Sequence, residues 1–232
     1  IGQVLIKYFL KKNYKIGVLD NLIYNHKLKK NNKVIFYNFS LEKIKNISDN
    51  YENIVLLSGL VGDPITKKYP ELSKKYNLLN IKKYLYKIKN LKKKIIFIST
   101  CSNYGLLKNN QIANESFKLK PLSLYAKQKV NIEKFLINNK KKFKFNFTIL
   151  RFATAFGLSP RMRFDLTVNQ FTHELLLKKE LIVYDPDTWR PYFHTEDFAK
   201  VVSEILNLDH KNINKEVFND GSDKNNHTKR NL

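Results

Sequence analysis

The sequence predicts an α/β protein, with a doubly wound parallel sheet covered by helices on both faces and a smaller C-terminal lobe. Short runs rich in β-branched and aromatic residues alternate with helical patterns, and βαβ alternation favours a parallel sheet. The 232 residues, 43% of them hydrophobic, suffice for one sizeable core and a small second lobe. After Gly157 the alternation gives way to proline-containing loops, which mark the expected lobe.

Each expected element follows from a local pattern. Apolar residues at helical spacing predict helices in the first part of the chain at residues 1–10, 72–88 and 123–138. Short β-rich runs predict strands at residues 15–19, 33–37, 54–57, 94–99 and 147–151. Beyond Gly157 we expect a helix near 166–178, a strand at 181–184, a loop with Pro186 and Pro191, and a helix near 196–206.

The charge of the chain does not by itself identify a partner. The net charge is +23, and clustered cations bind nucleic acid through phosphate contacts. Only five of the 43 basic residues are Arg, however, and the excess Lys accompanies much Asn, Ile and Tyr, which adenine- and thymine-rich codons specify. Aromatic residues stand mostly in apolar runs rather than between the lysines. We therefore expect a solvated lysine surface and no specific nucleic-acid partner.

Cysteine usage and the longest apolar runs indicate the compartment. Cys101 is the single cysteine, so an internal disulfide is excluded, and the five histidines lack metal-ligand spacing. No apolar run approaches the length of a membrane span, about 18 residues. We expect a cytoplasmic protein with no metal and no membrane partner. Because the chain begins with Ile1 and its sole Met is Met162, we expect a piece of a longer protein.

Tyr125 and Lys129 carry the clearest chemical signal. If their segment is helical, the i, i+4 spacing puts a phenol and an ammonium on one helix face. A free phenol, with a pKa of about 10, holds its proton too tightly to accept one at neutral pH, and a nearby cation favours the phenolate. The pair is a candidate acid/base. The alternative is an exposed helix face in a chain rich in Lys and Tyr.

The start of the chain indicates a nucleotide site. Gly2 opens a helix, and Asp20 ends the next strand eighteen residues later. This is near the spacing of about twenty between a glycine loop and the carboxylate that holds an adenosine ribose. Asn21 rather than an arginine follows the carboxylate, which disfavours a 2′-phosphate and predicts NAD over NADP. The alternative for Asp20 is a turn residue at the strand end.

Six motifs in a fixed order carry a family resemblance. They are Leu19-Asp20-Asn21-Leu22, residues 57–64, residues 99–105, Tyr125-x-x-x-Lys129, residues 150–157 and Trp189-Arg190-Pro191-Tyr192-Phe193-His194. Over essentially its whole length the chain resembles the extended short-chain dehydrogenase/reductases, the NAD-dependent epimerase/dehydratase group that modifies nucleotide sugars. The resemblance implies a Rossmann-like NAD-binding domain at 1–157, with its first strand and glycine loop ahead of Ile1. It implies a substrate-binding lobe at 158–232, incomplete and with segments that return to the core.

The resemblance also assigns roles to residues. It implies that Tyr125 is the acid/base, that Lys129 lowers the pKa of Tyr125 and holds the nicotinamide ribose, and that Thr100 binds the reacting sugar hydroxyl. The implied cofactor is NAD, bound by Gly2, Asp20, Asn21, Asn38, Phe39, Leu57, Ser58, Gly59, Asn77, Tyr125, Lys129 and Phe152. The implied nucleotide-sugar substrate is held by Thr100, Asn169 and Arg190. From the residues themselves we add Arg161 and Arg163, which face either this anionic substrate or solvent.

The expected reaction is reversible hydride transfer, with Tyr125 taking the proton of a sugar hydroxyl. Epimerisation or keto-reduction is favoured over 4,6-dehydration, because that branch has an Asp-Glu pair directly after the threonine and this chain has Cys101-Ser102. Reduction of a non-sugar ketone stays open, and so does a non-catalytic basic binding protein on the same scaffold. The resemblance further implies a homodimer.

Overall fold

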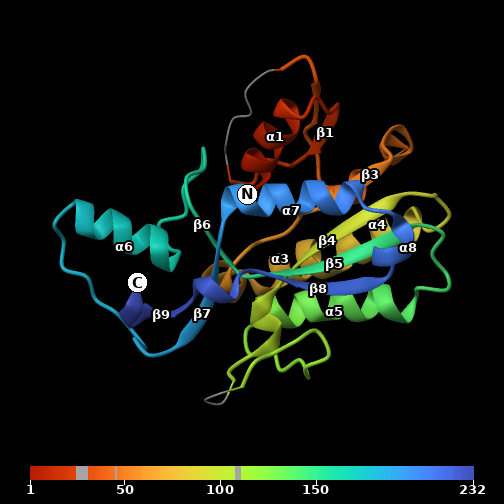
Figure 1. Ribbon diagram of the computed structural model, residues 1–232. Helices are drawn as coiled ribbons and strands as arrows, with labels where there is room; N and C mark the ends of the chain where they lie inside the picture. The colour runs from red at the N-terminus through yellow and green to blue at the C-terminus, as the bar shows by residue number, and fades with distance from the viewer. Residues whose placement is uncertain (25–30, 45, 108–110) are drawn as a thin grey trace.

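The computed structural model describes residues 1–24, 31–44, 46–107 and 111–232. Its centre is a four-stranded parallel sheet in the order β3 (Asn53–Leu56), β4 (Lys94–Thr100), β5 (Asn146–Phe152) and β8 (Glu216–Asp220) (Figure 1). In each of the two inner strands all residues but one are buried, as expected for parallel strands that are covered on both faces. The predicted α/β class is confirmed.

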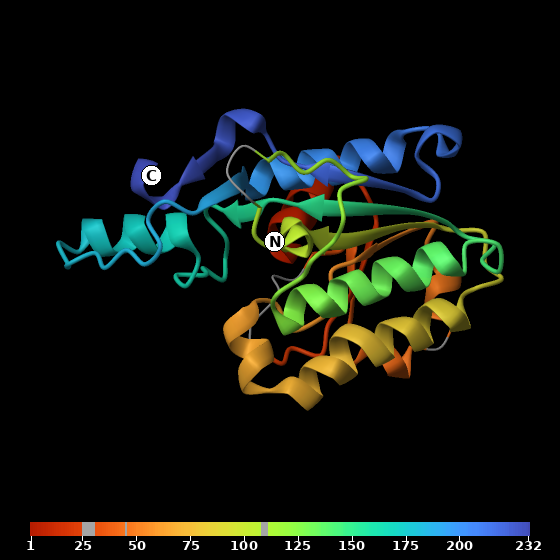
Figure 2. The same ribbon diagram turned by 90° about the horizontal axis from the view of Figure 1, so that it is seen from below.

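Helices cover both faces of this sheet. One face carries α5 (Leu124–Asn138) and a continuous helical segment made of α3 (Pro70–Lys74), the π turn η3 (Lys75–Leu79) and α4 (Asn80–Lys87). The other face carries α1 (Gly2–Lys11) and α7 (Thr195–Asn207), which pack against each other. Figure 2 shows the sheet between the two layers, with α4 and α5 on one side and α7 on the other.

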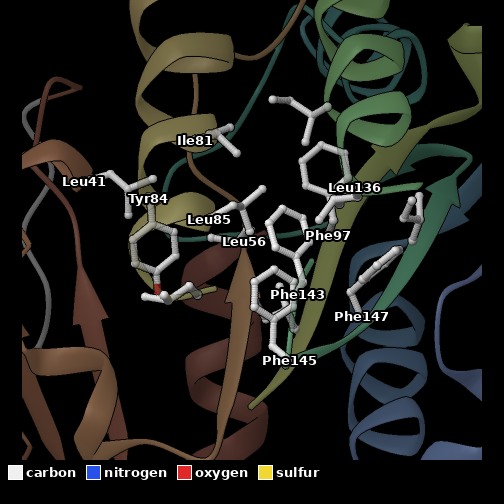
Figure 3. Close-up of a cluster of buried hydrophobic side chains, with 14 of the residues drawn as sticks. Leu41, Leu56, Ile81, Tyr84, Leu85, Phe97, Leu136, Phe143, Phe145 and Phe147 are labelled. Atoms are coloured by element: carbon white, nitrogen blue, oxygen red, sulfur yellow. The ribbon is translucent and has the colours of Figure 1, made fainter. Parts of the chain in front are cut away.

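The two faces of β4 contribute to two hydrophobic cores. Phe97 packs on the α4 and α5 side with Leu136 and Phe147 (Figure 3). Its neighbour Ile96 points the other way and packs in the cluster that contains Phe198 of α7. Because successive side chains of a strand face opposite sides, one short apolar run holds both helical layers against the sheet.

A second, two-stranded parallel sheet follows α1. It pairs β1 (Ile16–Leu19) with β2 (Val34–Tyr37), and Leu19 lies opposite Tyr37, so the carboxyl ends of the two strands are level. Gly17 lies against the ring of Tyr51, where an added Cβ would come within 2.3 Å of the ring Cζ. This close approach explains a glycine in the middle of a strand.

The chain after β5 divides between the core and a separate layer. α7 and β8 return to the core, whereas α6 (Thr167–Leu176) and the sheet of β6 (Thr154–Phe156), β7 (Trp189–His194) and β9 (Asn226–Thr228) lie beyond the carboxyl edge of the main sheet (Figure 1). The remaining helices are short: η1 (Leu41–Lys43), η2 (Ile47–Asn50), α2 (Asp63–Lys68), η4 (Cys101–Tyr104), α8 (His210–Ile213), η5 (Asp223–Asn225) and η6 (Lys229–Asn231). Among the helices that the structure describes, none has the length and apolar character needed to cross a bilayer.

Two expectations for the C-terminal part are wrong. Residues 181–184 form no strand, and Ile182 and Tyr184 are 60% and 73% exposed, so no sheet neighbour stabilises the extended run. Pro191 lies in β7 rather than in a loop. It is tolerated because only β9 pairs with β7 at this residue, while pairing with β6 starts at Tyr192. The short strands β6, β8 and β9 are not predicted by the sequence.

Candidate active site

The carboxyl edge of the main sheet brings the strand ends together. Thr100 of β4 pairs in register with Phe152 of β5, which in turn pairs with Asp220 of β8, so the three residues lie at one level. η4 follows Thr100 directly, and α5 packs against both η4 and β4 (Figure 1). Ligands of open parallel sheets bind just outside these carboxyl ends. The predicted catalytic residues therefore lie on elements that meet at this edge.

Thr100 begins the turn after β4. Its Oγ1 accepts a hydrogen bond from the Ser102 backbone amide at 3.2 Å, and its hydroxyl also interacts with the Cys101 thiol. Burial raises the pKa of the adjacent Cys101 thiol, and the charge of Arg190 lowers it. The arginine of β7 therefore lies within electrostatic reach of the residue that follows Thr100.

Tyr125 and Lys129 lie on the first two turns of α5. Ser123 caps this helix by accepting a hydrogen bond from the Ala126 amide at 3.2 Å. The Lys129 Nζ lies 5.8 Å from the centre of the Tyr125 ring and 4.8 Å from that of Phe97, and it donates to the Ile98 carbonyl at 2.7 Å. This bond holds the ammonium near the end of β4, against the carbonyl of the residue two positions before Thr100. The predicted i, i+4 pairing on one helix face is thus present.

Burial shifts the pKa values of both members of the pair. Burial raises the pKa of the Tyr125 phenol, the charges of Cys101 and Asp63 raise it further, and the charge of Arg163 lowers it. Burial lowers the pKa of Lys129 to about 8, against the charge of Glu133, which raises it. Burial is the largest influence on the pKa of Tyr125 in the protein alone, because the charged form of the phenol loses its hydration. The effect of Lys129 on Tyr125 stays a prediction.

The candidate cofactor residues on the first two strands lie in two adjacent loops. Asp20 follows β1, and its Oδ1 accepts the Leu22 backbone amide at 2.7 Å. The Asn21 side-chain amide donates to the Ser40 hydroxyl at 3.5 Å, which joins the loop after β1 to the loop after β2. That second loop starts with Asn38 and Phe39, and the Phe39 ring packs near Tyr37 with the ring centres 6.3 Å apart.

The loop after β3 holds the next group. Gly2, at the start of α1, lies beside Leu57, and a Cβ added at this glycine would lie 3.8 Å from the leucine Cδ1. Ser58 and Gly59 follow, and Gly59 has a φ of +141°, a conformation that side chains rarely adopt. The start of α1 and the end of β3 therefore approach each other closely, as a site for an extended ligand along the strand ends requires.

Two predicted cofactor residues are engaged inside the protein. Asn77, in the π turn, accepts the Leu60 amide at 2.7 Å and donates to the Leu60 carbonyl at 2.9 Å and to Gln128 Oε1 at 2.8 Å. It therefore supports the loop after β3 and ties it to α5. Phe152 is 4% exposed and packs on Phe198 with ring centres 4.0 Å apart, so its side chain belongs to the core.

Gly59→Ala should destabilise the fold by about 1–3 kcal/mol, the usual cost of such backbone strain. A Cβ at this position would lie 2.5 Å from the Asn77 Oδ1 and would displace the amide that holds Leu60. Urea or thermal unfolding measures the loss. Gly2→Ala is the matched control, because its Cβ meets nothing closer than 3.8 Å. Equal stability of the two variants would contradict the constraint at Gly59.

The loop before α6 brings two arginines toward the strand ends. The Arg161 guanidinium stacks on the Tyr24 ring at 4.1 Å, and Arg163 donates to the Val61 carbonyl at 3.5 Å while forming a two-point ion pair with Asp165. Asn169 of α6 supports this loop by donating to the Arg163 carbonyl at 3.1 Å. The structure thus joins these residues to the loops after β1 and β3.

Sequence reasoning missed a buried ion pair beneath the catalytic helix. Glu133 and Arg151 are 1% and 5% exposed, and the Arg151 Nη2 donates to the Glu133 Oε2 at 2.7 Å. The available signal was a third residue at the same spacing, since Tyr125, Lys129 and Glu133 follow one another at i, i+4.

Sequence reasoning missed Asp220 of β8 as well. Burial raises the pKa of its carboxyl to about 7, and the charge of Glu204 contributes to this rise.

A cavity lies at the opposite edge of the sheet, away from these residues. It has a volume of about 550 Å³ and is lined by Lys92, Lys93, Lys144 and their neighbours. It contains none of the predicted catalytic groups. Among the described residues no cluster of three His, Cys, Asp or Glu side chains could hold a metal ion.

Three solved structures with the same fold are 4-epimerases of UDP-sugars. UDP-glucose 4-epimerase from Thermotoga maritima, solved with UDP-glucose, is 24% identical, with 98% of this chain and 75% of that chain covered at a TM-score of 0.84. UDP-glucose 4-epimerase from Thermus thermophilus, solved with NAD, is 20% identical, with 99% and 76% covered at 0.84. UDP-glucuronic acid 4-epimerase from Bacillus cereus is 23% identical, with 94% and 73% covered at 0.82. At this identity the likeness establishes the fold.

The parallel sheet and the residues at its carboxyl edge define a Rossmann-like α/β enzyme. The family model of the NAD dependent epimerase/dehydratase family matches residues 1–221. The chain therefore belongs to that family, as the six sequence motifs predict. NAD is the cofactor of the family, so the site must be compatible with a dinucleotide.

The residues at the strand ends fit a dinucleotide. The carboxylate of Asp20 stands at the end of β1, where a ribose hydroxyl can be bound, and the first-turn amides of α1 lie beside Leu57. The Lys129 ammonium has three N–H donors, of which one reaches Ile98 among the described residues. These groups have the donor and acceptor chemistry that a ribose and a diphosphate require.

Proposed function

We propose that this protein is an NAD-dependent epimerase that acts on nucleotide sugars. One observation carries the proposal: Tyr125 and Lys129 begin a helix that packs on the end of β4, where Thr100 stands, in a chain of the epimerase/dehydratase family. The solved neighbours include 4-epimerases of UDP-glucose and UDP-glucuronic acid, which supports a UDP-sugar as the substrate. Residues 158–232 supply the substrate-binding lobe in this proposal, apart from α7 and β8.

The proposed chemistry assigns one task to each side chain. Tyr125 takes the proton of a sugar hydroxyl and later returns it, and Thr100 hydrogen-bonds that hydroxyl. Lys129 binds the nicotinamide ribose and favours the phenolate once the site is filled. When bound, NAD supplies the hydride acceptor and donor for the sugar carbon. Arg190, Arg161, Arg163 and Asn169 are proposed to face the diphosphate of the substrate.

Keto-reduction is the second candidate, because the same side chains serve a single hydride transfer. Dehydration is disfavoured, because the two residues after Thr100 are Cys101 and Ser102 and neither provides a carboxyl acid/base. Burial also raises the pKa of the cysteine thiol.

The proposal includes a homodimer. Light scattering after size-exclusion chromatography measures the molar mass that tests it.

The proposal is tested by incubating the protein with NAD and, separately, UDP-glucose, UDP-N-acetylglucosamine and UDP-glucuronic acid. Epimerisation converts each substrate into its C4 epimer without net change in NADH, and proton NMR of the anomeric signals detects it. Net formation of NADH together with a keto-sugar would indicate the keto-reductase instead, running in its oxidative direction. Binding of NAD without turnover of any nucleotide sugar would contradict the proposed function.

Asp20→Ala should weaken NAD binding about tenfold or more, since a hydrogen bond to a charged group contributes about 1.5–3 kcal/mol. The preference for NAD over NADP should shrink, because the carboxylate that repels a 2′-phosphate is gone. Fluorescence titration with both cofactors measures the ratio. Asp20→Asn is the matched control, since its side-chain oxygen can keep the turn bond to Leu22 while the charge is lost. Equal affinity of the parent for both cofactors would show that Asp20 selects neither.

A further inference from the structure

We infer that Glu133 is a positioning residue for the reaction: it holds Lys129 in its ionised form and in its place against the end of β4. The inference rests on the proposed function, because it concerns the ammonium that serves Tyr125. Glu133 lies one helical turn beyond Lys129 on α5, so the two side chains share a helix face. Both are buried, at 1% and 6% exposure, where unscreened charges interact strongly.

Hydrogen bonds lock the Glu133 carboxylate as an acceptor. Its Oε1 accepts from the Ser99 hydroxyl at 2.5 Å and from the Asn103 amide at 2.7 Å. Arg151 donates to both carboxylate oxygens, with Nε 3.2 Å from Oε1 and 3.1 Å from Oε2 and Nη2 2.7 Å from Oε2. Neutral donors from two residues and the Arg151 guanidinium thus hold the carboxylate in one place. Lys129 lies one helical turn away from it, and the charge of Glu133 acts on the ammonium.

The same network surrounds the catalytic threonine. Ser99 precedes Thr100 and Asn103 lies in η4 just after it, so Glu133 holds the chain on both sides of Thr100. Arg151 also donates to the Tyr104 hydroxyl of η4 at 2.8 Å. One carboxylate thus connects the strand end that carries Thr100 with the helix that carries Tyr125 and Lys129. This connection explains why an ion pair is kept in a core that apolar residues could fill.

Lys129 has other charged groups around it, on the elements that pack against α5. In the described chain these elements include α2, α3, η3, α4, η4, β4 and β5. Their titratable groups are Asp63, Lys67, Lys68, Glu71, Lys74, Lys75, Tyr76, Lys82, Lys83, Tyr84, Tyr86, Lys87, Lys94, Cys101, Tyr104 and Arg151. Burial lowers the pKa of Lys129, and the charge of Glu133 raises it. The carboxylate is thus the partner whose removal should matter most.

The test measures the titration of Lys129 itself and needs no substrate. Trace acetic anhydride labels each lysine in proportion to its neutral form, and peptide mass spectrometry from pH 6 to 11 follows Lys129. Lys134, exposed on the same helix, is the internal control and should label alike in every variant. In the parent Lys129 should titrate near pH 8.

Three variants should shift the pH midpoint of Lys129 labelling in a defined order. Glu133→Gln should lower it by about one pH unit or more, because the nearest anion is lost and the Arg151 cation remains. Arg151→Met should raise it, because the carboxylate then serves Lys129 alone. The double variant Glu133→Gln/Arg151→Met should fall between Glu133→Gln and the parent. It removes both members of the Glu133–Arg151 ion pair and leaves no unpaired guanidinium, so it carries the test if Glu133→Gln does not fold.

Opposite shifts in the two single variants cannot come from general loosening of the fold. A Lys129 midpoint that is unchanged in the double variant, or that moves the same way in both single variants, overturns the inference. If the parent turns over a nucleotide sugar, the alkaline limb of its pH–rate profile should move with the labelling midpoint. A protein without turnover still reports the labelling order, so failure of the proposed function and failure of this inference are separate results.

Discussion

Tyr125→Phe should reduce turnover of the nucleotide sugar about a hundredfold or more, the contribution of a positioned acid/base, and leave the melting temperature almost unchanged. The substitution removes only the phenol oxygen. Among the described residues that oxygen makes no hydrogen bond within the protein, so its loss should change the free energy of unfolding by no more than about 0.5 kcal/mol. NMR assays of sugar conversion and thermal unfolding of the same preparation measure both quantities.

Tyr86→Phe is the matched control for this substitution. Tyr86 is 45% exposed on α4, and its ring centre lies 6.2 Å from that of Phe135 near the C-terminal end of α5, so its variant should match the parent in rate and stability. Full activity of Tyr125→Phe on every sugar that the parent converts would remove the acid/base role. The Tyr125 and Lys129 pair would then be an ordinary helix face.

Lys129→Met should lower the rate by a similar factor and weaken NAD binding about tenfold or more, the loss expected for hydrogen bonds from a charged group. Both effects are expected because one ammonium is assigned to the phenol and to the ribose. The double variant Tyr125→Phe/Lys129→Met should be little worse than the more damaging single variant, since residues that act as a unit are non-additive. Additive losses would indicate that the two side chains act independently.

Lys129→Met should leave the folded protein as stable as the parent, or more stable, at pH 7. Burial lowers the pKa of Lys129 from 10.5 to about 8 in the folded protein. Between these values the unfolded chain binds more protons, so this group makes stability rise with pH there. Below pH 8 both states are protonated, and the cost of burying the charge is fully present.

Lys129→Met removes that cost and loses one hydrogen bond to Ile98, which contributes about 1 kcal/mol. Its melting temperature at pH 7 should therefore equal or exceed that of the parent, and the advantage should shrink as the pH rises through 10. Melting curves at pH 7 and pH 10 measure the difference. A clear loss of stability at pH 7 would mean that Lys129 serves the fold rather than the reaction.

The local pattern of the sequence is sufficient for the elements that carry the site. It predicts the strand that ends at Thr100 and the helix that begins after Ser123 to within one residue, because a run of buried apolar residues and a periodic helix face are encoded by neighbours in the chain. The i, i+4 spacing of Tyr125 and Lys129 has the same origin. A short strand such as β8 has no such signal, since its place is set by pairing with β5.

The α/β class, the order of the main elements and the identity of the acid/base candidates follow from the sequence alone. The surroundings of these candidates depend on the tertiary structure. The Glu133–Arg151 pair joins residues eighteen positions apart, and Arg163 contacts Val61, which lies 102 positions earlier in the chain. The direction of the Tyr125 pKa depends on it too, because desolvation reflects every chain segment that covers the phenol. Periodicity records which face of an element is buried, but the charges and the solvent exposure at a site are set by contacts between elements distant in the chain.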